Sequence, residues 1–194
     1  MKKTTYILAS AITLLLIFCF LLPVILFKTN ESITETTIFL KHSPGEAGKE
    51  IVLPGFSKLV ELGGESYTVS ICDSLGQLVK PSITIEESDS VNSPVLRVNP
   101  MWNNLVEADT VPQVGLIRIN AQLPENTYAH VIVPDNETEI AVLTMPRGML
   151  KEIVESNIEV KLADFKNADL LLYRNRGVTA ENCTFRNLKV DFYY

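Results

Sequence analysis

Residues 165–173, Phe-Lys-Asn-Ala-Asp-Leu-Leu-Leu-Tyr, align with residues 185–193, Phe-Arg-Asn-Leu-Lys-Val-Asp-Phe-Tyr, at an offset of 20 positions. Both segments keep a Phe, a base, an Asn, an apolar centre and a Tyr. A period of about 20 residues matches one coil of a β-solenoid, in which each coil stacks on the previous one. Two unrelated hairpin strands would share the same residue types, so both interpretations stay open at this point.

The solenoid interpretation makes a geometric prediction. Equivalent residues on adjacent parallel coils lie about 4.8 Å apart, so we expect the rings of Phe165 and Phe185 to stack inside the domain. Asn167 and Asn187 should then lie one above the other at the following turn. The last coil would present an open edge, and we expect residues 192–194 or a partner to cover it.

Upstream of this repeat, short runs of β-branched and aromatic residues alternate with Gly, Pro and Asn, a pattern that is typical of strands and turns. In one such run Ile117 and Ile119 alternate with Arg118 and Asn120, as a half-buried strand requires. The predicted strands are Ser57–Leu62, Tyr67–Cys72, Ser82–Glu86, Val95–Val98, Gly115–Ala121, Tyr128–Val133, Glu139–Thr144, Glu152–Leu162 with a break near Asn157, Ala168–Arg174 and Leu188–Phe192. We therefore expect an all-β domain, either β-solenoid-like or a mixed β-sheet.

One short helix is also predicted in this part of the chain. Asn99 can cap it and Pro100 can occupy its first turn. Trp102, Leu105 and Val106 would then share one face of the helix.

The N-terminal segment 6–27 reads YILASAITLLLIFCFLLPVILF, 22 uncharged residues of which 15 are Leu, Ile, Phe or Val. A helix of this length reaches roughly 33 Å, enough to cross a hydrocarbon core of about 30 Å. Lys2 and Lys3 precede it, whereas Lys28 is followed closely by Glu31 and Glu35. The positive-inside rule then places the N-terminus in the cytoplasm.

A cleaved signal peptide is the alternative for this segment. Its apolar stretch is long for a signal peptide, and the residues after Phe27 lack the small residues of a cleavage site. We therefore expect a single-pass protein of the cytoplasmic membrane. Its parts would be a cytoplasmic N-terminus 1–5, a transmembrane helix 6–27, a juxtamembrane linker 28–50 and a β-rich outer domain 51–194.

Charge argues against a nucleic-acid partner. Three of the 17 basic residues and none of the 23 acidic residues lie in the first 28 positions, which leaves 14 basic against 23 acidic residues beyond them. Nucleic-acid binding needs a basic face. The 46% hydrophobic content is likewise too high for a disordered chain.

A family resemblance rests on two segments. Residues 53–63, LPGFSKLVELG, lead into Tyr67-Thr68-Val69, and residues 150–156, LKEIVES, precede further short strands. Together they resemble the bacterial putative auto-transporter adhesin head-domain family (GIN domain), over Ile51 to Tyr194. The resemblance implies an extracytoplasmic, all-β, solenoid-like domain without an established enzymatic role.

No residue is predicted to be catalytic, cofactor-binding or metal-binding. His42 and His130 are the two histidines, and neither has a zinc-ligand spacing to a cysteine. The acidic groups 86–89 and 135–139 offer oxygen atoms to calcium, but without the spacing of a known loop, so we expect solvated turns there. Carboxylate pairs for glycoside cleavage meet in space rather than in sequence and stay open.

Two further groups have alternative interpretations. Cys72 and Cys183 could form a disulfide in an oxidising compartment, although their apolar surroundings favour free thiols. Several bases crowd the C-terminal end and could dock an anionic glycan or lipid headgroup; we expect them instead on solvent-facing strand positions. They are Lys166, Arg174, Arg176, Arg186 and Lys189.

These observations predict a membrane-anchored envelope protein that acts in binding, adhesion or scaffolding and is not an enzyme. Its partners would be the membrane and an unidentified envelope protein or glycan, and its oligomeric state stays open. A carbohydrate-active hydrolase on a β-helical scaffold is the first alternative. An envelope sensory or regulatory ectodomain is the second.

Overall fold

The computed structural model describes residues 34–41, 45–62, 69–119, 127–134, 137–175 and 177–191. The regular structure in these ranges is β, apart from one turn of 3-10 helix, and the all-β prediction is therefore confirmed. No helix in these ranges is long and apolar enough to cross a membrane. The predicted membrane helix 6–27 lies outside the described residues.

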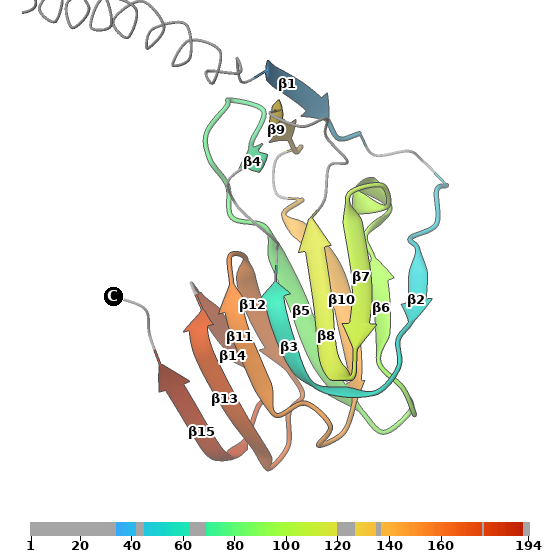
Figure 1. Ribbon diagram of the computed structural model, residues 1–194, viewed down its shortest axis with the longest axis vertical. Helices are drawn as coiled ribbons and strands as arrows, with labels where there is room; N and C mark the ends of the chain where they lie inside the picture. The colour runs from blue at the N-terminus through green and yellow to red at the C-terminus, as the bar shows by residue number, and fades with distance from the viewer. Residues whose placement is uncertain are drawn as a thin grey trace, which may run out of the picture. The chain divides into compact units, whose positions relative to one another are not determined.

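The strands form three sheets, drawn in Figure 1. Sheet A has the order β1 (Thr34–Phe39), β9 (Thr127–Ile132), β4 (Val69–Cys72). Sheet B has the order β14 (Val178–Glu181), β12 (Glu159–Ala163), β5 (Ser82–Ser88), β10 (Glu139–Pro146), β6 (Val95–Val98), β2 (Glu50–Val52). Sheet C has the order β15 (Phe185–Asp191), β13 (Ala168–Asn175), β11 (Glu152–Ser156), β3 (Phe56–Leu62), β8 (Gln113–Ile119), β7 (Val106–Val111).

Sheets B and C stack face to face, with sheet C in front in Figure 1. Parallel pairs join β14 through β10 in sheet B and β15 through β8 in sheet C. Antiparallel pairs add β6 and β2 to sheet B and β7 to sheet C. Both are therefore mixed sheets, which confirms this form of the fold prediction.

From β11 onward the chain alternates between the two sheets, with β11, β13 and β15 in sheet C and β12 and β14 in sheet B. Each strand pairs in parallel with the strand two elements later. Register partners are 19 residues apart for Ile153 and Leu172, and 18 apart for Val160 and Val178. The spatial period is thus slightly shorter than the 20-residue sequence offset.

The predicted ring stack is confirmed. Phe165 and Phe185 have ring centroids 6.3 Å apart and an interplanar angle of 29°. Phe165 is fully buried, whereas Phe185 is half-buried at the rim of the core.

The predicted alignment of Asn167 with Asn187 is wrong. Asn187 lies beside Asp169, because the residues that pair between β13 and β15 are 17 or 18 positions apart rather than 20. Asn167 instead precedes β13 with a left-handed φ of 51°. Its N–H donates to the hydroxyl of Thr184, at 3.1 Å.

The core lies between sheets B and C, where inward positions alternate with outward ones along each strand. Leu59 and Ile153 of sheet C and Ile83 and Leu143 of sheet B are completely buried. Trp102 is also completely buried. The inward side chains of sheets B and C therefore form one hydrophobic core.

The predicted short helix is a single 3-10 turn, Pro100–Trp102. The Asn99 side chain caps it by accepting from the N–H of Met101, at 3.2 Å. The turn is shorter than the helix we expect from sequence, because Val106 already begins β7 and pairs with Ile119.

Part of the predicted linker 28–50 forms a strand. Residues 34–39 form β1, beside β9 in sheet A. The N–H of Lys49 donates to Asn103 Oδ1 at 2.8 Å, and Asn103 Nδ2 donates to the carbonyl of Ala47 at 3.1 Å. The chain thus contacts the body of the domain already before β2.

Candidate binding face

An apolar row crosses the outer face of sheet C. It consists of Tyr173 on β13, Val154 on β11, Val60 on β3 and Leu116 on β8, which are successive register partners. In β11 and β3 the preceding residues, Ile153 and Leu59, point inward and are completely buried. Strand alternation therefore turns the row outward, and all four of its members are half-buried.

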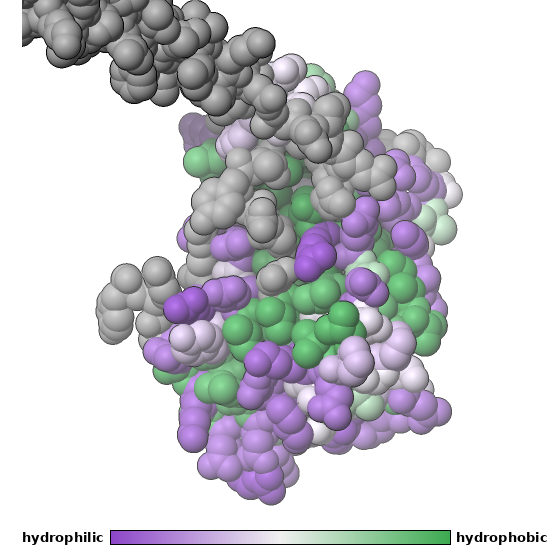
Figure 2. Space-filling view, in the orientation of Figure 1, coloured by the Kyte–Doolittle hydropathy of each residue, from purple (hydrophilic) through white to green (hydrophobic). Residues whose placement is uncertain are grey.

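Charged residues flank this apolar row. On one side Arg174 Nη1 lies 2.9 Å from Glu155 Oε1. On the other side Lys58 Nζ lies 3.0 Å from Glu152 Oε2. Figure 2 shows hydrophobic residues gathered in the middle of this face and hydrophilic residues around them. The face has an apolar centre and a rim whose charges are balanced locally.

Asp169 adds a third ion pair on this face. It accepts from Arg186 Nε at 2.9 Å and from Asn187 Nδ2 at 2.8 Å, both from the neighbouring strand β15. Donation from Arg186, and then from Asn187, lowers the pKa of the Asp169 carboxyl from 3.8 to about 2. The same contact with Asp169 raises the pKa of Arg186. Asp169 therefore links β13 to β15 as a carboxylate.

The outer face of sheet B is polar by comparison. Thr84 donates to Glu139 at 2.5 Å, and Thr144 donates to Glu86 at 2.7 Å. Arg97 Nε lies 3.0 Å from Glu50 Oε2. The two outer faces of one sandwich thus have different chemistry.

Shallow hollows lie near both ends of the apolar row. One is lined by Glu107, Asp109 and Leu116, together with Lys49 and Ile51 at β2. The other is lined by Glu152, Leu171 and other residues of β11, β13 and β15. Both are open depressions of the surface, so the face is not flat at either end of the row.

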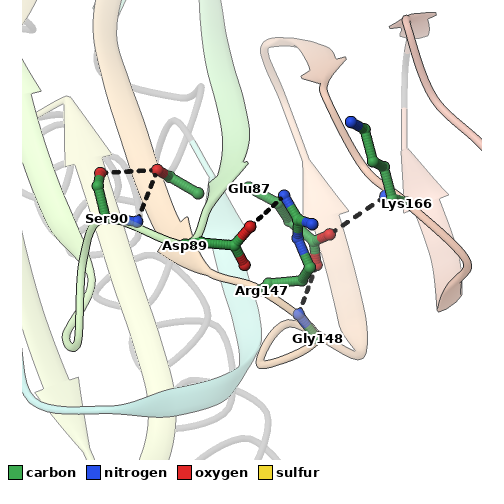
Figure 3. A network of polar contacts seen from close by, with 7 residues as sticks. Glu87, Asp89, Ser90, Arg147, Gly148 and Lys166 are labelled. Carbon is green, nitrogen blue, oxygen red and sulfur yellow. Dashed lines mark hydrogen bonds and ion pairs between the residues drawn. The ribbon is translucent and has the colours of Figure 1, made fainter.

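Glu87 shows that the acidic group 86–89 is not the solvated turn predicted from sequence. Glu86 and Glu87 belong to β5, and the side chain of Glu87 is 4% exposed. Its carboxylate accepts from the N–H of Gly148 at 2.9 Å and of Lys166 at 3.4 Å (Figure 3). Glu87 therefore holds two turns against the end of β5.

A surface ion pair lies beside Glu87. Arg147 Nη2 is 3.0 Å from Asp89 Oδ2 (Figure 3). Within the described part of the chain, no group of His, Cys, Asp and Glu could hold a metal ion. Residues 135 and 136 of the second acidic group lie outside that part.

Among the described residues, the cysteines form no disulfide, and no group of three or more His, Cys, Asp and Glu residues could hold a metal ion. His42 lies outside the described residues, and His130 on β9 contacts the ring of Tyr128 edge to face, with centroids 5.1 Å apart. Tyr128 also hydrogen-bonds the hydroxyl of Ser70. Cys72 is buried, Cys183 is half-buried, and both are free thiols.

The four C-terminal bases that the structure describes do not gather into one anion site. Arg174 pairs with Glu155 and Arg186 pairs with Asp169. Lys166 lies before β13 and Lys189 lies within β15, both exposed. Arg176 is outside the described residues.

The apolar row could not be predicted from the sequence, because its members come from four strands that are far apart in the chain. The consecutive residues Leu170, Leu171 and Leu172 of β13 place Leu171 on the outer face, but its register partner is Glu152, so this run does not lead to the row. Tyr173 and its partners become neighbours only through the register.

Neither a known protein-family profile nor a curated protein sequence matches the chain. Among solved structures it is similar to one described as a "putative lipid binding protein" from Parabacteroides distasonis ATCC 8503. The two chains are 12% identical, and their TM-score is 0.42. The match covers 81% of this chain and 65% of that one. Another, described as a "putative adhesin" from Parabacteroides merdae ATCC 43184, has 14% identity, a TM-score of 0.33, and coverage of 81% and 61%.

This chain therefore spans just under two thirds of the length of each of these proteins. Neither the identities nor the TM-scores reach a level from which a shared function follows. The resemblance to the GIN domain family accordingly stays a prediction.

Proposed function

We propose that this chain is a non-catalytic binding protein of the cell envelope, and that the outer face of sheet C contacts a partner protein. The observation that carries the proposal is the apolar row of Tyr173, Val154, Val60 and Leu116, which lies on an outer face between charged rims. A contiguous apolar patch with a polar rim is typical of protein interaction sites.

The composition of the row favours a protein over a glycan. Three of its four members are aliphatic, so they contribute apolar area but no hydrogen bond. Glycan hydroxyls need polar partners when they lose water, whereas Lys58 and Glu152, like Arg174 and Glu155, are already engaged with each other. A partner with an apolar patch of its own would fit this face better.

The proposal also includes membrane anchoring through segment 6–27, with the β-rich domain outside the cytoplasm. Its support is the length of the uncharged segment and the bases Lys2 and Lys3 before it. We further propose that β11 to β15 are coils of a short β-solenoid. The alternation of these strands between sheets C and B, with parallel neighbours, supports that assignment.

Site-specific photo-crosslinking tests the binding face in cells of the source organism. A photoreactive amino acid at Val154 should give a covalent adduct with one protein, and Val60→Lys in the same chain should abolish it. The matched control carries the probe at Thr84, on the outer face of sheet B. Absence of an adduct at Val154, or the same adduct from Thr84, would contradict the proposed face.

A further inference from the structure

Strand β15 ends sheet C with core-type residues that are not fully covered. It pairs with β13 on one side and is the last strand of the sheet order on the other. Leu188 is 44% exposed and Val190 is 41% exposed. Their register partners on β13, Leu170 and Leu172, face the core and are each 3% exposed. The inward side of β15 therefore presents apolar surface within the described structure.

The edge of β15 is able to accept another strand. Natural edge strands are blocked by inward-pointing charges, prolines, bulges or short length. From Leu188 to Asp191 the inward positions are Leu and Val, and the segment contains no proline. The register with β13 is regular from Asp169↔Asn187 to Tyr173↔Asp191. At 7 residues β15 is also longer than β14, the 4-residue edge strand of sheet B on the same side.

The outward charges of β15 distinguish the possible partners. Lys189 and Asp191 lie two positions apart on the outer face, next to Leu171 and Tyr173 of β13. When such a strand pairs antiparallel with a copy of itself, a two-fold axis through Val190 places each Lys189 opposite Asp191 of the second copy. Directly opposite residues in an antiparallel pair have Cβ atoms about 5 Å apart, so this register forms two cross-strand ion pairs.

Neighbouring registers are less favourable. An axis through Lys189 would place Lys189 opposite its own copy, and like charges directly opposite are destabilising. An axis through Leu188 would place the charged Arg186 opposite the apolar Val190. With the axis through Val190, Val190 meets its copy on the inward face and Leu188 lies diagonal to it.

We propose that β15 is the interface for a second copy of this chain, paired antiparallel about a two-fold axis at Val190. The contact joins the two sheets C into one continuous sheet. It also brings the exposed Val190 side chains of the two copies together at the open end of each core. An isologous contact of this kind closes after two subunits, so it does not continue into a filament.

Cysteine crosslinking in the full chain, purified in detergent, tests the register. Val190→Cys should form a disulfide-linked dimer under mild oxidation, because the two copies of residue 190 face each other across the axis. Leu188→Cys is the matched control on the same face. Its two copies would lie about 13 Å apart along the strands, beyond the roughly 7 Å that a disulfide spans between Cα atoms. The chain without an added cysteine controls for Cys19, Cys72 and Cys183.

Charge exchange tests complementarity independently of the disulfide. Lys189→Asp should weaken the dimer by roughly tenfold in analytical ultracentrifugation, since it replaces two attractions with two repulsions. Lys189→Asp combined with Asp191→Lys should restore the dimer. A monomeric wild-type chain, equal crosslinking at Leu188, or no rescue by the double exchange would overturn the proposal. A monomer that instead takes up a strand from another protein would overturn it as well.

Discussion

At the residue scale, Asp169 links β13 to β15 through a pH-sensitive contact. It accepts from Arg186 and Asn187, and its pKa is lowered from 3.8 to about 2. A folded-state pKa below the unfolded value means that Asp169 stabilises the fold at pH above about 4. That contribution should disappear as the pH falls through about 2. Urea unfolding of wild type and Asp169→Asn should therefore differ at pH 7 and converge near pH 2.

The cause of the shift can be checked directly. In the Arg186→Gln variant the largest cause is removed, so the pKa of Asp169 should rise toward 3.8. The measurement is an NMR titration of the Asp169 carboxyl carbon. A wild-type Asp169 that titrates near 3.8 would contradict the hydrogen bonds described for it.

At Gly48 the fold leaves no room for a side chain. A Cβ added to Gly48 would lie 2.2 Å from the carbonyl oxygen of Val98, which is a backbone atom. Gly48→Ala should therefore destabilise the domain by about 1–3 kcal/mol, as overpacking does. Gly55→Ala is the matched control, since its Cβ would meet only the side chain of Met149, at 3.7 Å. Chemical denaturation of both variants should show a loss for Gly48→Ala alone.

At the scale of elements, Phe165 connects the turn before β13 to the body of the core. It is completely buried and stacks on the half-buried Phe185, with centroids 6.3 Å apart. Phe165→Ala should lower the free energy of unfolding by about 3–5 kcal/mol. Phe185→Ala should cost less, because part of its ring already contacts water. Equal losses for the two variants in urea unfolding would show that the ring environments are not those described.

Local composition predicted strands that are rich in β-branched and other apolar residues. Val95–Val98 has the same bounds in sequence and structure, and the Asn99 cap is also where the sequence predicts it. β7 was missed because Glu107 and Asp109 are residue types that strands usually lack. Its strand character comes from pairing with β8. β2 and β14 have only 3 and 4 residues and give little periodic signal.

Pairing could be predicted only where the sequence repeats. The phenylalanine stack followed from the 20-residue offset, but β13 and β15 pair at an offset of 18 from Asp169 onward, so the asparagines do not align. A bulge changes which residues are opposite without changing the residue types, so composition does not reveal it. The apolar row has the same limitation, since Val60 and Leu116 become neighbours only through β3–β8 pairing.

At the scale of the whole molecule, one sandwich has two outer faces with different chemistry. Sheet B presents hydroxyls and carboxylates that hydrogen-bond each other, as Thr84 does with Glu139. Sheet C presents the apolar row between ion pairs. In the proposed dimer both rows would lie on one continuous sheet, so one partner surface could contact two rows. Binding through two linked sites is tighter than through one.

Fractionation of cells tests whether segment 6–27 anchors the chain in the membrane. Segment 6–27 has 22 uncharged residues, 15 of them Leu, Ile, Phe or Val, and each such residue favours insertion by about 0.3–0.6 kcal/mol near the membrane centre. The full chain should therefore sediment with membranes and resist carbonate extraction, whereas a chain beginning at Thr29 should stay in the soluble fraction.

With Lys2 and Lys3 in the cytoplasm, a reporter that is active only outside the cytoplasm should be active when fused after Tyr194. Mass spectrometry should find segment 6–27 intact on the membrane-bound protein. A soluble form beginning near Thr29 in cells that express the full chain would identify the segment as a cleaved signal peptide.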